Sequence, residues 1–589
     1  MTPATRRVLP GFGLGLSTTV LYLAVLVLIP LLAALWQATR LSWGEFTAAV
    51  WSERAIAAYR LTLTASFAAG LINVVLGLIV AWTLVRYEFP GKRILDALVD
   101  VPFALPTAVA GLVYASLYVP NGWLGQWLVP LGIEGAYTRT GIILVLTFTG
   151  FPFVIRTVQP VLEDIDRETE QAAETLGANR WQVFRHVLLP VLVPPAITGF
   201  TLAFARAIGE YGSVIFMSSN MPFMTEIAPV LIVSRLEEFA YREASAIAMV
   251  LLAMSFVLLI VINLLERWSQ PGSAPRSVRR VGHLLVQGIS WPFAKILAQV
   301  ITEKEVSNEV VLRPIPTRPW VRWALIGTTA FIIIWLVAIP LANVFVEAFR
   351  TGFWKYWTYL VSDKDTRHAI YLTLIVAPLA VALNTVFGVA AAYTIARFRF
   401  PGRTLLTSLI DIPFSVSPVV VGLAFVLLFG LHSPLGLWLK THGYQIIFAP
   451  PALVLATAFV TVPFVARELL PMMEAQGAEE EIAARSLGAN AWQMFWYVTL
   501  PNIRWGLLYG IILCNARAMG EFGAIYVVSG RISGKTDTMP LRVEKLFQEY
   551  QQPAAFAVAS ILTMLALATL LLKVVVEQRL KQEKHAPPE

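Results

Sequence analysis

The sequence predicts an all-α membrane protein with about twelve transmembrane helices, arranged as two parallel six-helix repeats. Of its 589 residues, 57% are hydrophobic and only 14% are charged, and the mean hydropathy is +0.68. Soluble domains carry about 25% charged residues, whereas a spanning helix needs ~20 mostly apolar residues. The chain contains many such runs, and it lacks the alternating segments of about ten residues that indicate a membrane β-barrel.

An internal duplication is the second observation. "RYEFPGKR" recurs as "RFRFPGRT", and "AAETLGANRWQVF" recurs as "AARSLGANAWQMF". Gly177 and Gly488 lie 311 residues apart, as do Gly209 and Gly520. The constant spacing means that the two copies align without a net insertion over this interval. We therefore expect two equivalent halves in one chain.

We divide the chain into a first half (1–266), a linker (267–320) and a second half (321–589). Apolar residues of the linker recur at helical spacing. This pattern indicates either an amphipathic helix on the cytoplasmic membrane face or a spacer helix packed on the protein itself. The spans are expected near 16–38, 58–85, 95–119, 139–160, 190–215 and 243–266, and near 323–349, 369–396, 406–431, 447–470, 502–527 and 553–576.

Six spans in each half place the start and end of both halves on the same side of the membrane, so the repeats are parallel. Lys and Arg are more numerous on that side, which predicts that both termini face the cytoplasm. The formal net charge of +8 is interpreted as a determinant of topology. The expected surroundings are a lipid bilayer, and no nucleic-acid partner is expected.

The longest cytoplasmic loop of each half follows its fourth span. The two loops read "EQAAETLGANRWQVFRHVLLP" and "EIAARSLGANAWQMFWYVTLP". In each, a pair of alanines is followed four residues later by a glycine and thirteen residues after that by a proline. The spacing predicts a short helix, a turn at Gly177 or Gly488, and a second helix. The small residues would let the surface of another protein approach the backbone closely.

These loops resemble the EAA motif of ABC importer permeases, whose coupling helices insert into clefts on ATPase subunits. Gln171 and Ile482 stand where the family motif has glutamate. Glu170 and Glu481 come one residue earlier, about 100° around a helix, which puts the salt bridge of the family's glutamate in question. The expected ATPase-docking residues are Gln171, Ala172, Ala173, Gly177, Ile482, Ala483, Ala484 and Gly488.

A wider resemblance covers nearly everything except the linker. Through "RYEFPGKRILDALVDVPFALPTAVAGL" and "GEYGSVIF", the first half resembles the T-type permease of bacterial sulfate/thiosulfate importers. Through "LIDIPFSVSPVVVGL" and "LPNIRWGLLYGIILCNARAMGEFGAI", the second half resembles its W-type partner. The resemblance implies a type I ABC importer permease fold, in which fusion and linker are departures from the usual separate subunits.

The resemblance also implies a function. The chain would be the transmembrane subunit of an ATP-driven importer of sulfate, with thiosulfate as a further substrate, in the bacterial plasma (inner) membrane. A substrate-binding protein would deliver the solute outside, and an ATPase subunit dimer would act inside. ATP and Mg would bind to that partner, because "GRISGKTD" has one residue too few between its glycines for a phosphate-binding P-loop.

Two charged pairs lie in otherwise apolar segments, "ARAIGEYG" and "ARAMGEFG". Arg206 and Glu210, and Arg517 and Glu521, are one helical turn apart, so each pair can neutralise itself. Two interpretations stay open: the pairs line the translocation path or its gate, or they are structural cross-links between spans. Intramembrane carboxylates are functional candidates by default. Asp100 and Asp411, beside prolines in the third spans, either carry function or cap a broken helix.

Other function classes are less well supported. ABC permeases for molybdate, ferric iron or thiamine share the EAA motif and are alternatives on substrate. An ion-coupled secondary transporter also has repeats and charges near the midplane, but it has no use for paired alanine–glycine loops. The chain shows no catalytic constellation and no metal-ligand spacing, so we expect no enzymatic activity and no cofactor in this chain itself.

Overall fold

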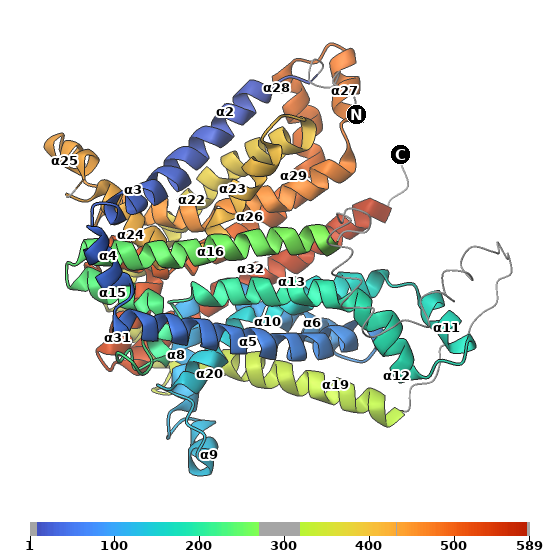
Figure 1. The fold of residues 1–589 in the computed structure, drawn as a ribbon, viewed down its shortest axis with the longest axis horizontal. Coiled ribbons are helices and arrows are strands. Elements are labelled where there is room, and N and C mark those ends of the chain that lie inside the picture. Colours follow the sequence, from blue (N-terminus) through green and yellow to red (C-terminus); the bar gives the residue numbers. More distant parts are fainter. Residues whose placement is uncertain (1–8, 270–318, 432, 586–589) are drawn as a thin grey trace.

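The computed structural model describes residues 9–269, 319–431 and 433–585, and every regular element in these ranges is helical (Figure 1). Nine of the described helices are long and apolar enough to cross a membrane, and three bent helix pairs bring the number to twelve. The predicted all-α architecture of about twelve spans is therefore confirmed. The nine spans lie in Phe12–Ala38 (α2, η1, α3), Glu53–Arg86 (α5), Arg139–Asp164 (α10), Arg180–Ile208 (α12, η3, α13), Tyr241–Ser269 (α16), Pro319–Phe349 (α19, η4, α20), Lys364–Arg397 (α22), Pro450–Gln476 (α26) and Gln552–His585 (α32).

The third span of each half, expected near 95–119 and 406–431, is bent sharply within these boundaries. In the first half, α6 (Lys92–Val99) and α7 (Val101–Ala104) are followed by α8 (Thr107–Tyr118) after a bend of 109°. In the second half, α23 (Arg403–Ser415) and α24 (Pro418–Phe429) meet at 103°. Prolines at both breaks explain the bends, because the residue before a proline is pushed out of the helical region.

The fifth spans also end earlier than predicted. In the first half, α13 (Leu189–Ile208) stops before a turn that leads to the short helix α14 (Val214–Met217). In the second half, α29 (Leu500–Met519) is followed by α30 (Gly523–Ser529) at an angle of 53°. The predicted boundaries of 190–215 and 502–527 ran through these turns, which contain the glutamates of the two Arg–Glu pairs.

Four spans contain a five-residue π-helical segment that ends two residues before a proline. A proline inside a helix has no N–H to donate, and its ring clashes with the carbonyl four residues earlier. A wider π turn relieves this clash while the helix continues. The four segments are η1 (Ala24–Leu28, before Pro30), η3 (Phe184–Leu188, before Pro190), η4 (Ile334–Ala338, before Pro340) and η5 (Phe495–Thr499, before Pro501).

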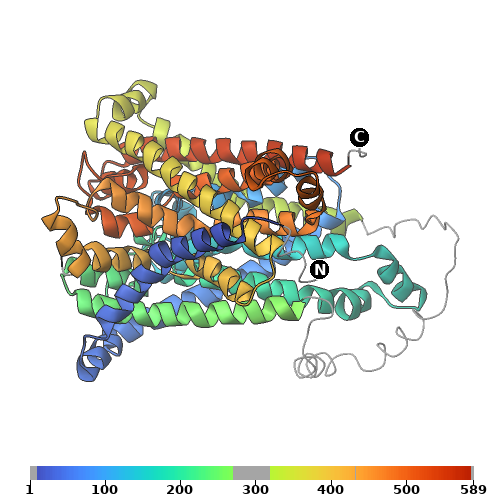
Figure 2. The same cartoon turned by 90° about the horizontal axis from the view of Figure 1, so that it is seen from above.

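The first span of each half packs on the other half. In the first half, α2 packs against α22, and Tyr22 Oη donates a hydrogen bond to Asn384 Oδ1 at 2.7 Å. In the second half, α20 packs against α8, and Asn343 Nδ2 donates to Ser116 Oγ at 2.9 Å. Seen from above, α16 and α32 run along opposite sides of the bundle (Figure 2). The two halves are thus interlocked.

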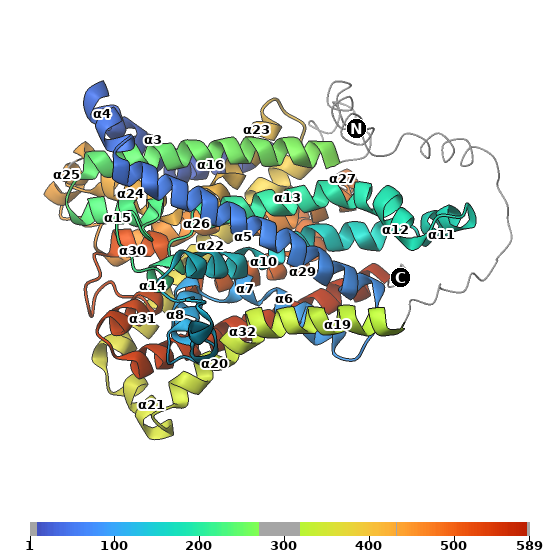
Figure 3. The same ribbon diagram turned by 60° about the horizontal axis from the view of Figure 1, so that its bottom comes forward.

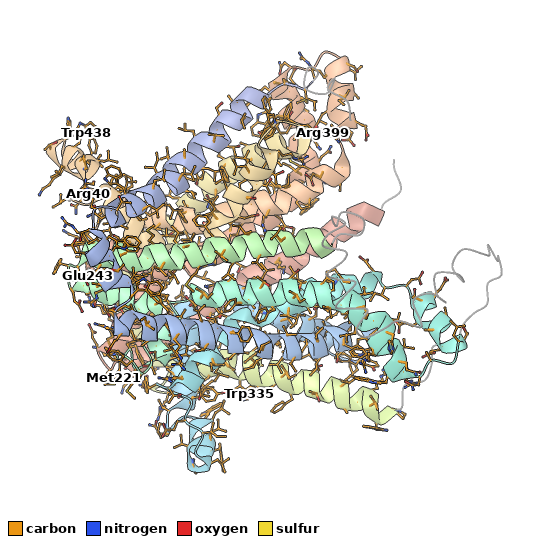
Figure 4. The ribbon with its side chains drawn as sticks, viewed as in Figure 1. Arg40, Met221, Glu243, Trp335, Arg399 and Trp438 are labelled. Atoms are coloured by element: carbon orange, nitrogen blue, oxygen red, sulfur yellow. The ribbon has the colours of Figure 1, made fainter. Side chains whose placement is uncertain are left out.

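The two ends of the bundle differ. The predicted docking loops, in α11 (Arg167–Thr175) and α27 (Glu479–Ser486), lie at the same end as the start of α2 (Figure 1). At the opposite end, α4 (Trp43–Val50) and α21 (Phe353–Val361) project from opposite sides of the bundle (Figure 3). Figure 4 places Arg399 at the docking-loop end and Met221 and Trp438 toward the other. The predicted linker helix lies outside the described residues, and the residue boundaries of the three regions stay a prediction.

Candidate docking loops and gate

The two docking loops have the predicted helix–turn–helix geometry. In the first, Gly177 has φ +90° and its N–H donates to Glu174 O at 2.9 Å. In the second, Gly488 has φ +91° and its N–H donates to Arg485 O at 3.1 Å. A positive φ favours glycine, because a Cβ makes this conformation costly. The helices that follow, α12 (Arg180–Val183) and α28 (Ala491–Met494), both start with an Asn–Gln capping box.

The structure places the predicted docking residues on matching positions of the two loops. Gln171, Ala172 and Ala173 belong to α11, and their counterparts in α27 are Ile482, Ala483 and Ala484, with a glycine turn after each set. Ala172 and Ala483 are exposed, whereas Ala173 is buried. Leu487 and Trp492 beside the second turn are 88% and 69% exposed, so an apolar surface lies open there. The docking role of these residues stays a prediction.

An ion pair anchors each docking loop. The sequence analysis had placed such a salt bridge in question. Arg86 Nη2 lies 2.5 Å from Glu170 Oε1, and Arg397 Nε lies 2.6 Å from Glu481 Oε2. The glutamates one residue before Gln171 and Ile482 therefore reach the arginines that end α5 and α22. Arg86 and Arg397 are 311 residues apart, as are Glu170 and Glu481. This shared spacing was the signal in the sequence that could have indicated the two ion pairs.

The second loop is held more firmly than the first. Glu481 also accepts a hydrogen bond from Thr499 Oγ1 at 3.0 Å, and Arg397 donates to Met473 O at 2.5 Å. The side chains of Arg397 and Glu481 are only 5% and 3% exposed, compared with 12% and 22% for Arg86 and Glu170. Burial strengthens charge-assisted hydrogen bonds, so the two loops are not mechanically equivalent.

Both predicted Arg–Glu pairs are formed at the ends of the fifth spans. Arg206 Nη1 lies 2.6 Å from Glu210 Oε2, and Arg517 Nη2 lies 2.8 Å from Glu521 Oε2. The glutamate side chains are 2% and 1% exposed, whereas the arginine side chains are 22% and 17% exposed. Each carboxylate is thus enclosed, while part of each guanidinium group remains accessible.

The glutamates also hold the turns that follow the spans. Glu210 Oε1 accepts hydrogen bonds from the backbone N–H and the hydroxyl of Ser213, both at 3.0 Å. Glu521 Oε1 accepts from the backbone N–H of Ala524 at 3.0 Å. Backbone N–H groups at the start of a helix have no intrahelical partner, and a carboxylate satisfies them. Each glutamate therefore has a structural role whatever its part in transport.

The same turns meet the breaks of the third spans across the two halves. A Cβ on Gly209 would lie 3.1 Å from Ser417 Cα, and one on Gly520 would lie 3.0 Å from Pro106 Cα. Ser417 Oγ donates to Gly209 O at 3.0 Å. Pro106 and Ser417 are themselves 311 residues apart, so the contact is reciprocal. Glycine permits this close approach of two backbones.

Aromatic rings seal this junction. Tyr211 stacks on Phe522 with ring centroids 5.9 Å apart and an interplanar angle of 15°. Both rings are almost completely buried. Phe216 of the first half also contacts Phe522 and Phe547 of the second. We refer to the contact between residues 209–212, 520–523 and the two third-span breaks as the central junction; the halves are closed against each other there.

Asp100 and Asp411 do not cap the broken helices. Asp100 stands at the start of α7 but makes no side-chain capping bond there. Its carboxylate instead lies 2.7 Å from Arg156 Nε and 2.6 Å from Lys573 Nζ, and Asp411 lies 2.7 Å from Arg467 Nε. The sequence analysis missed Arg156 and Arg467, although their separation of 311 residues marked them as equivalent positions. It also missed Lys573, which has no charged counterpart in the first half.

Comparison with known proteins now defines the class of this chain. A family model, the inner membrane component of binding-protein-dependent transport systems, matches residues 73–274 and again residues 384–582. The two matches begin 311 residues apart and together cover more than half of the chain. The chain belongs to this family, and it contains two copies of the family's domain. It is a transport permease, which agrees with the predicted non-enzymatic role.

Individual relatives narrow this class. The chain is 49% identical over 263 residues to the sulfate transport system permease protein CysT of Escherichia coli (strain K12), covering 45% of this chain and 95% of that protein. It is 50% identical over 271 residues to CysW of the same strain, covering 46% and 93%. CysW of Synechocystis is 51% identical over 264 residues, covering 45% and 95%. The predicted resemblance to both permease types in one chain is confirmed.

Among the described residues, no group of three or more His, Cys, Asp or Glu side chains could hold a metal ion.

Proposed function

We propose that this chain carries sulfate, and thiosulfate as a further substrate, across the bacterial inner membrane into the cytoplasm. The observation that carries the proposal is the identity of about 50% to both CysT and CysW, each over more than nine-tenths of its length. Because these relatives are sulfate permeases, sulfate is favoured over molybdate, ferric iron and thiamine. Membership of a binding-protein-dependent family also disfavours an ion-coupled secondary transporter.

Energy would come from a dimer of ATPase subunits that binds ATP and Mg. These subunits would dock on α11–α12 and on α27–α28, where exposed small residues and apolar side chains surround Gly177 and Gly488. Arg86–Glu170 and Arg397–Glu481 tie the docking loops to α5 and α22, so a push on a loop would move a spanning helix. Both termini would lie in the cytoplasm, with the docking loops.

A substrate-binding protein would deliver the solute at the opposite end. The central junction would act as the gate, and the partly exposed guanidinium groups of Arg206 and Arg517 would meet the anion on its path. Balanced Arg–Glu pairs suit passage, because a bare arginine would hold a divalent anion too tightly and a bare glutamate would repel it.

Labelled sulfate uptake tests the proposal. Cells that lack their own sulfate importer are compared with and without this chain, together with its ATPase and binding protein. We expect uptake that depends on the chain and that unlabelled thiosulfate reduces by competition. Uptake insensitive to thiosulfate but abolished by molybdate would redirect the proposal to that oxyanion, and unchanged sulfate accumulation would refute it.

A further inference from the structure

The loop after α30 has an unusual backbone. Gly530 and Arg531 both adopt the left-handed conformation, with φ of +65° and +51°. Such a φ is uncommon for a residue with a side chain. The turn is fixed by the backbone N–H of Arg531, which donates to Ser529 Oγ at 3.1 Å. The segment lies between the fifth and sixth spans, at the end of the bundle away from the docking loops.

From this turn, the Arg531 side chain contacts the first half of the chain. Its Nη2 lies 3.1 Å from Oε1 of Glu237, the last residue of α15 (Ala228–Glu237). Its Nη1 donates to Tyr526 Oη at 2.7 Å, and the guanidinium carbon lies 4.6 Å from the centre of the Tyr526 ring. Its Nη1 also lies 3.9 Å from Oε1 of buried Glu544. Arg531 thus joins α30 and α31 (Met539–Gln548) to α15.

Tyr526 connects these contacts to the central junction. Its ring centroid lies 5.3 Å from that of Tyr211 and 5.5 Å from that of Phe522. Those two rings form the stacked pair between the halves. A separation of the junction would therefore have to displace Tyr526, and with it the partners of Arg531.

The duplication shows that this contact is one-sided. Asn220, the counterpart of Arg531, also has a positive φ, +55°, and its N–H likewise donates to a serine hydroxyl, Ser218 Oγ, at 2.9 Å. Its side chain, however, donates to Ile215 O within the first half. The counterpart of Glu237 is Gln548, which is uncharged. The left-handed residue and its hydrogen bond to serine are repeated, whereas the ion pair of Arg531 with Glu237 has no charged equivalent at Asn220 and Gln548.

We propose that Arg531 is a positioning residue of the gate: it clasps the second half to Glu237 of the first and holds the central junction closed until the loaded binding protein docks. The inference rests on the proposed function for its physiological meaning. Because the Arg531 and Glu237 side chains are 37% and 54% exposed, the clasp is a modest restraint. Its loss should raise the population of the open gate roughly two- to fivefold.

The experiment measures gate separation and ATP hydrolysis in the same reconstituted complex. Spin labels are placed on Met221→Cys and Ile532→Cys, which are exposed residues at equivalent positions of the two halves, in a Cys514→Ala background. Ala203 occupies the position equivalent to Cys514, so alanine fits that site. With Arg531→Gln, we expect more of the long label separation and a roughly two- to fivefold rise in hydrolysis without binding protein.

Two further variants keep the proposal falsifiable. Glu237→Gln, which removes the same contact from the first half, should shift the label separation in the same direction as Arg531→Gln. Arg235→Gln is the matched control. Arg235 lies on α15, the helix of Glu237, but it pairs with Glu238 and Glu243 of its own half.

Unchanged label separation in Arg531→Gln, unchanged hydrolysis, or the same effect from Arg235→Gln would overturn the clasp. A wild-type complex that ignores sulfate-loaded binding protein would instead count against the proposed function, while the label separation would still decide the clasp.

Discussion

Lys573 Nζ lies 2.6 Å from Asp100 Oδ2, and these two residues come from opposite halves of the duplicated chain. Both side chains are mostly buried, at 14% and 11% exposed. Asp100 also pairs with Arg156 on α10, so one carboxylate joins spans of both halves. In the second half, Asp411 pairs with Arg467 in the same way, but Arg467 is 45% exposed. The two equivalent aspartates therefore differ in their number of cationic partners and in how deeply those partners are buried.

We therefore expect Asp100→Asn to destabilise the chain by about 3–5 kcal/mol, because Lys573 loses its buried partner and Arg156 keeps only the more exposed Asp96. Lys573→Met should cost less, about 1.5–3 kcal/mol, since Asp100 keeps Arg156. Asp411→Asn is the matched control and should cost about 0–1 kcal/mol. Unfolding in detergent, followed by circular dichroism, would check this order. Equal losses for the two asparagine variants would contradict it.

The two docking loops should respond unequally to loss of their ion pairs. Arg397→Ala leaves Glu481 buried without its partner, and we expect it to reduce coupled transport roughly tenfold or more. Arg86→Ala, at the more exposed pair, should retain a larger share of transport. The measurements are solute transported per ATP hydrolysed and recovery of the ATPase in pull-downs. Indistinguishable losses would show that the difference in burial has no mechanical consequence.

The glycine turns of the docking loops give a test of the coupling assignment. An added Cβ at Gly177 or Gly488 would meet no atom within 4 Å, so Gly→Glu at both positions should leave the chain folded. The backbone conformation costs about 1–2 kcal/mol per site, and the bulky charge blocks docking, so transport should be abolished. Gly→Asn at both positions is the control, since asparagine tolerates left-handed backbone. Normal transport and ATPase binding by the glutamate variant would refute the assignment.

The Arg–Glu pairs can be neutralised with little change of shape. In Arg206→Gln/Glu210→Gln, the glutamine Oε1 can still accept from the Ser213 N–H, so membrane levels and ATPase docking should be normal. We expect sulfate uptake to be lost or hydrolysis to be uncoupled from it. Glu210→Gln alone should harm folding more than the double variant, because it leaves the mostly enclosed Arg206 guanidinium group without its carboxylate partner.

The matching variant at Arg517 and Glu521 serves as the second test of the same idea. Unchanged uptake in both double variants would reduce the pairs to structural cross-links.

Glu544 should make stability depend on pH. Burial raises the pKa of Glu544 from 4.5 to about 7. The negative charges of Glu237 and Asp537 add to this rise, and the positive charges of Arg531 and Lys545 oppose it. The folded chain then binds this proton more tightly than the unfolded chain, so stability falls as pH rises from 4.5 to about 7. Up to ~3 kcal/mol is lost across this range.

Glu544→Gln should remove that pH dependence and stabilise the chain at pH 8, whereas Glu549→Gln, at an exposed position, should not. Thermal unfolding at pH 5, 6, 7 and 8 provides the comparison. A steep fall that persists in Glu544→Gln would assign the effect to another group.

Much of this architecture was readable from local pattern. Hydrophobic runs predicted twelve spans, and the spacing of 311 residues predicted two equivalent halves, because apolar length and repetition are properties of the chain itself. The turns at Gly177 and Gly488 followed from glycine between amphipathic segments. The Arg–Glu pairs were also local, because residues four apart on a helix share a face.

Other features depended on how the spans pack. Pro106 and Pro418 were visible in the sequence, but the close approach of Gly520 and Gly209 from the other half to the two breaks was not. The ion pairs of Glu170 and Glu481 were questioned from their angle on the helix, because the positions of Arg86 and Arg397 opposite them were not available from spacing alone.

The sequence by itself therefore determined the class, the duplication and the local elements of this protein. Only the tertiary structure decided which charges meet across the halves, as Lys573 meets Asp100 and Arg531 meets Glu237. The physical reason is that a long-range pair exists only where packing brings two side chains within a few ångströms. Over intervals of several hundred residues, hydrophobic periodicity specifies that a helix is buried but not which partner its charged side chain contacts.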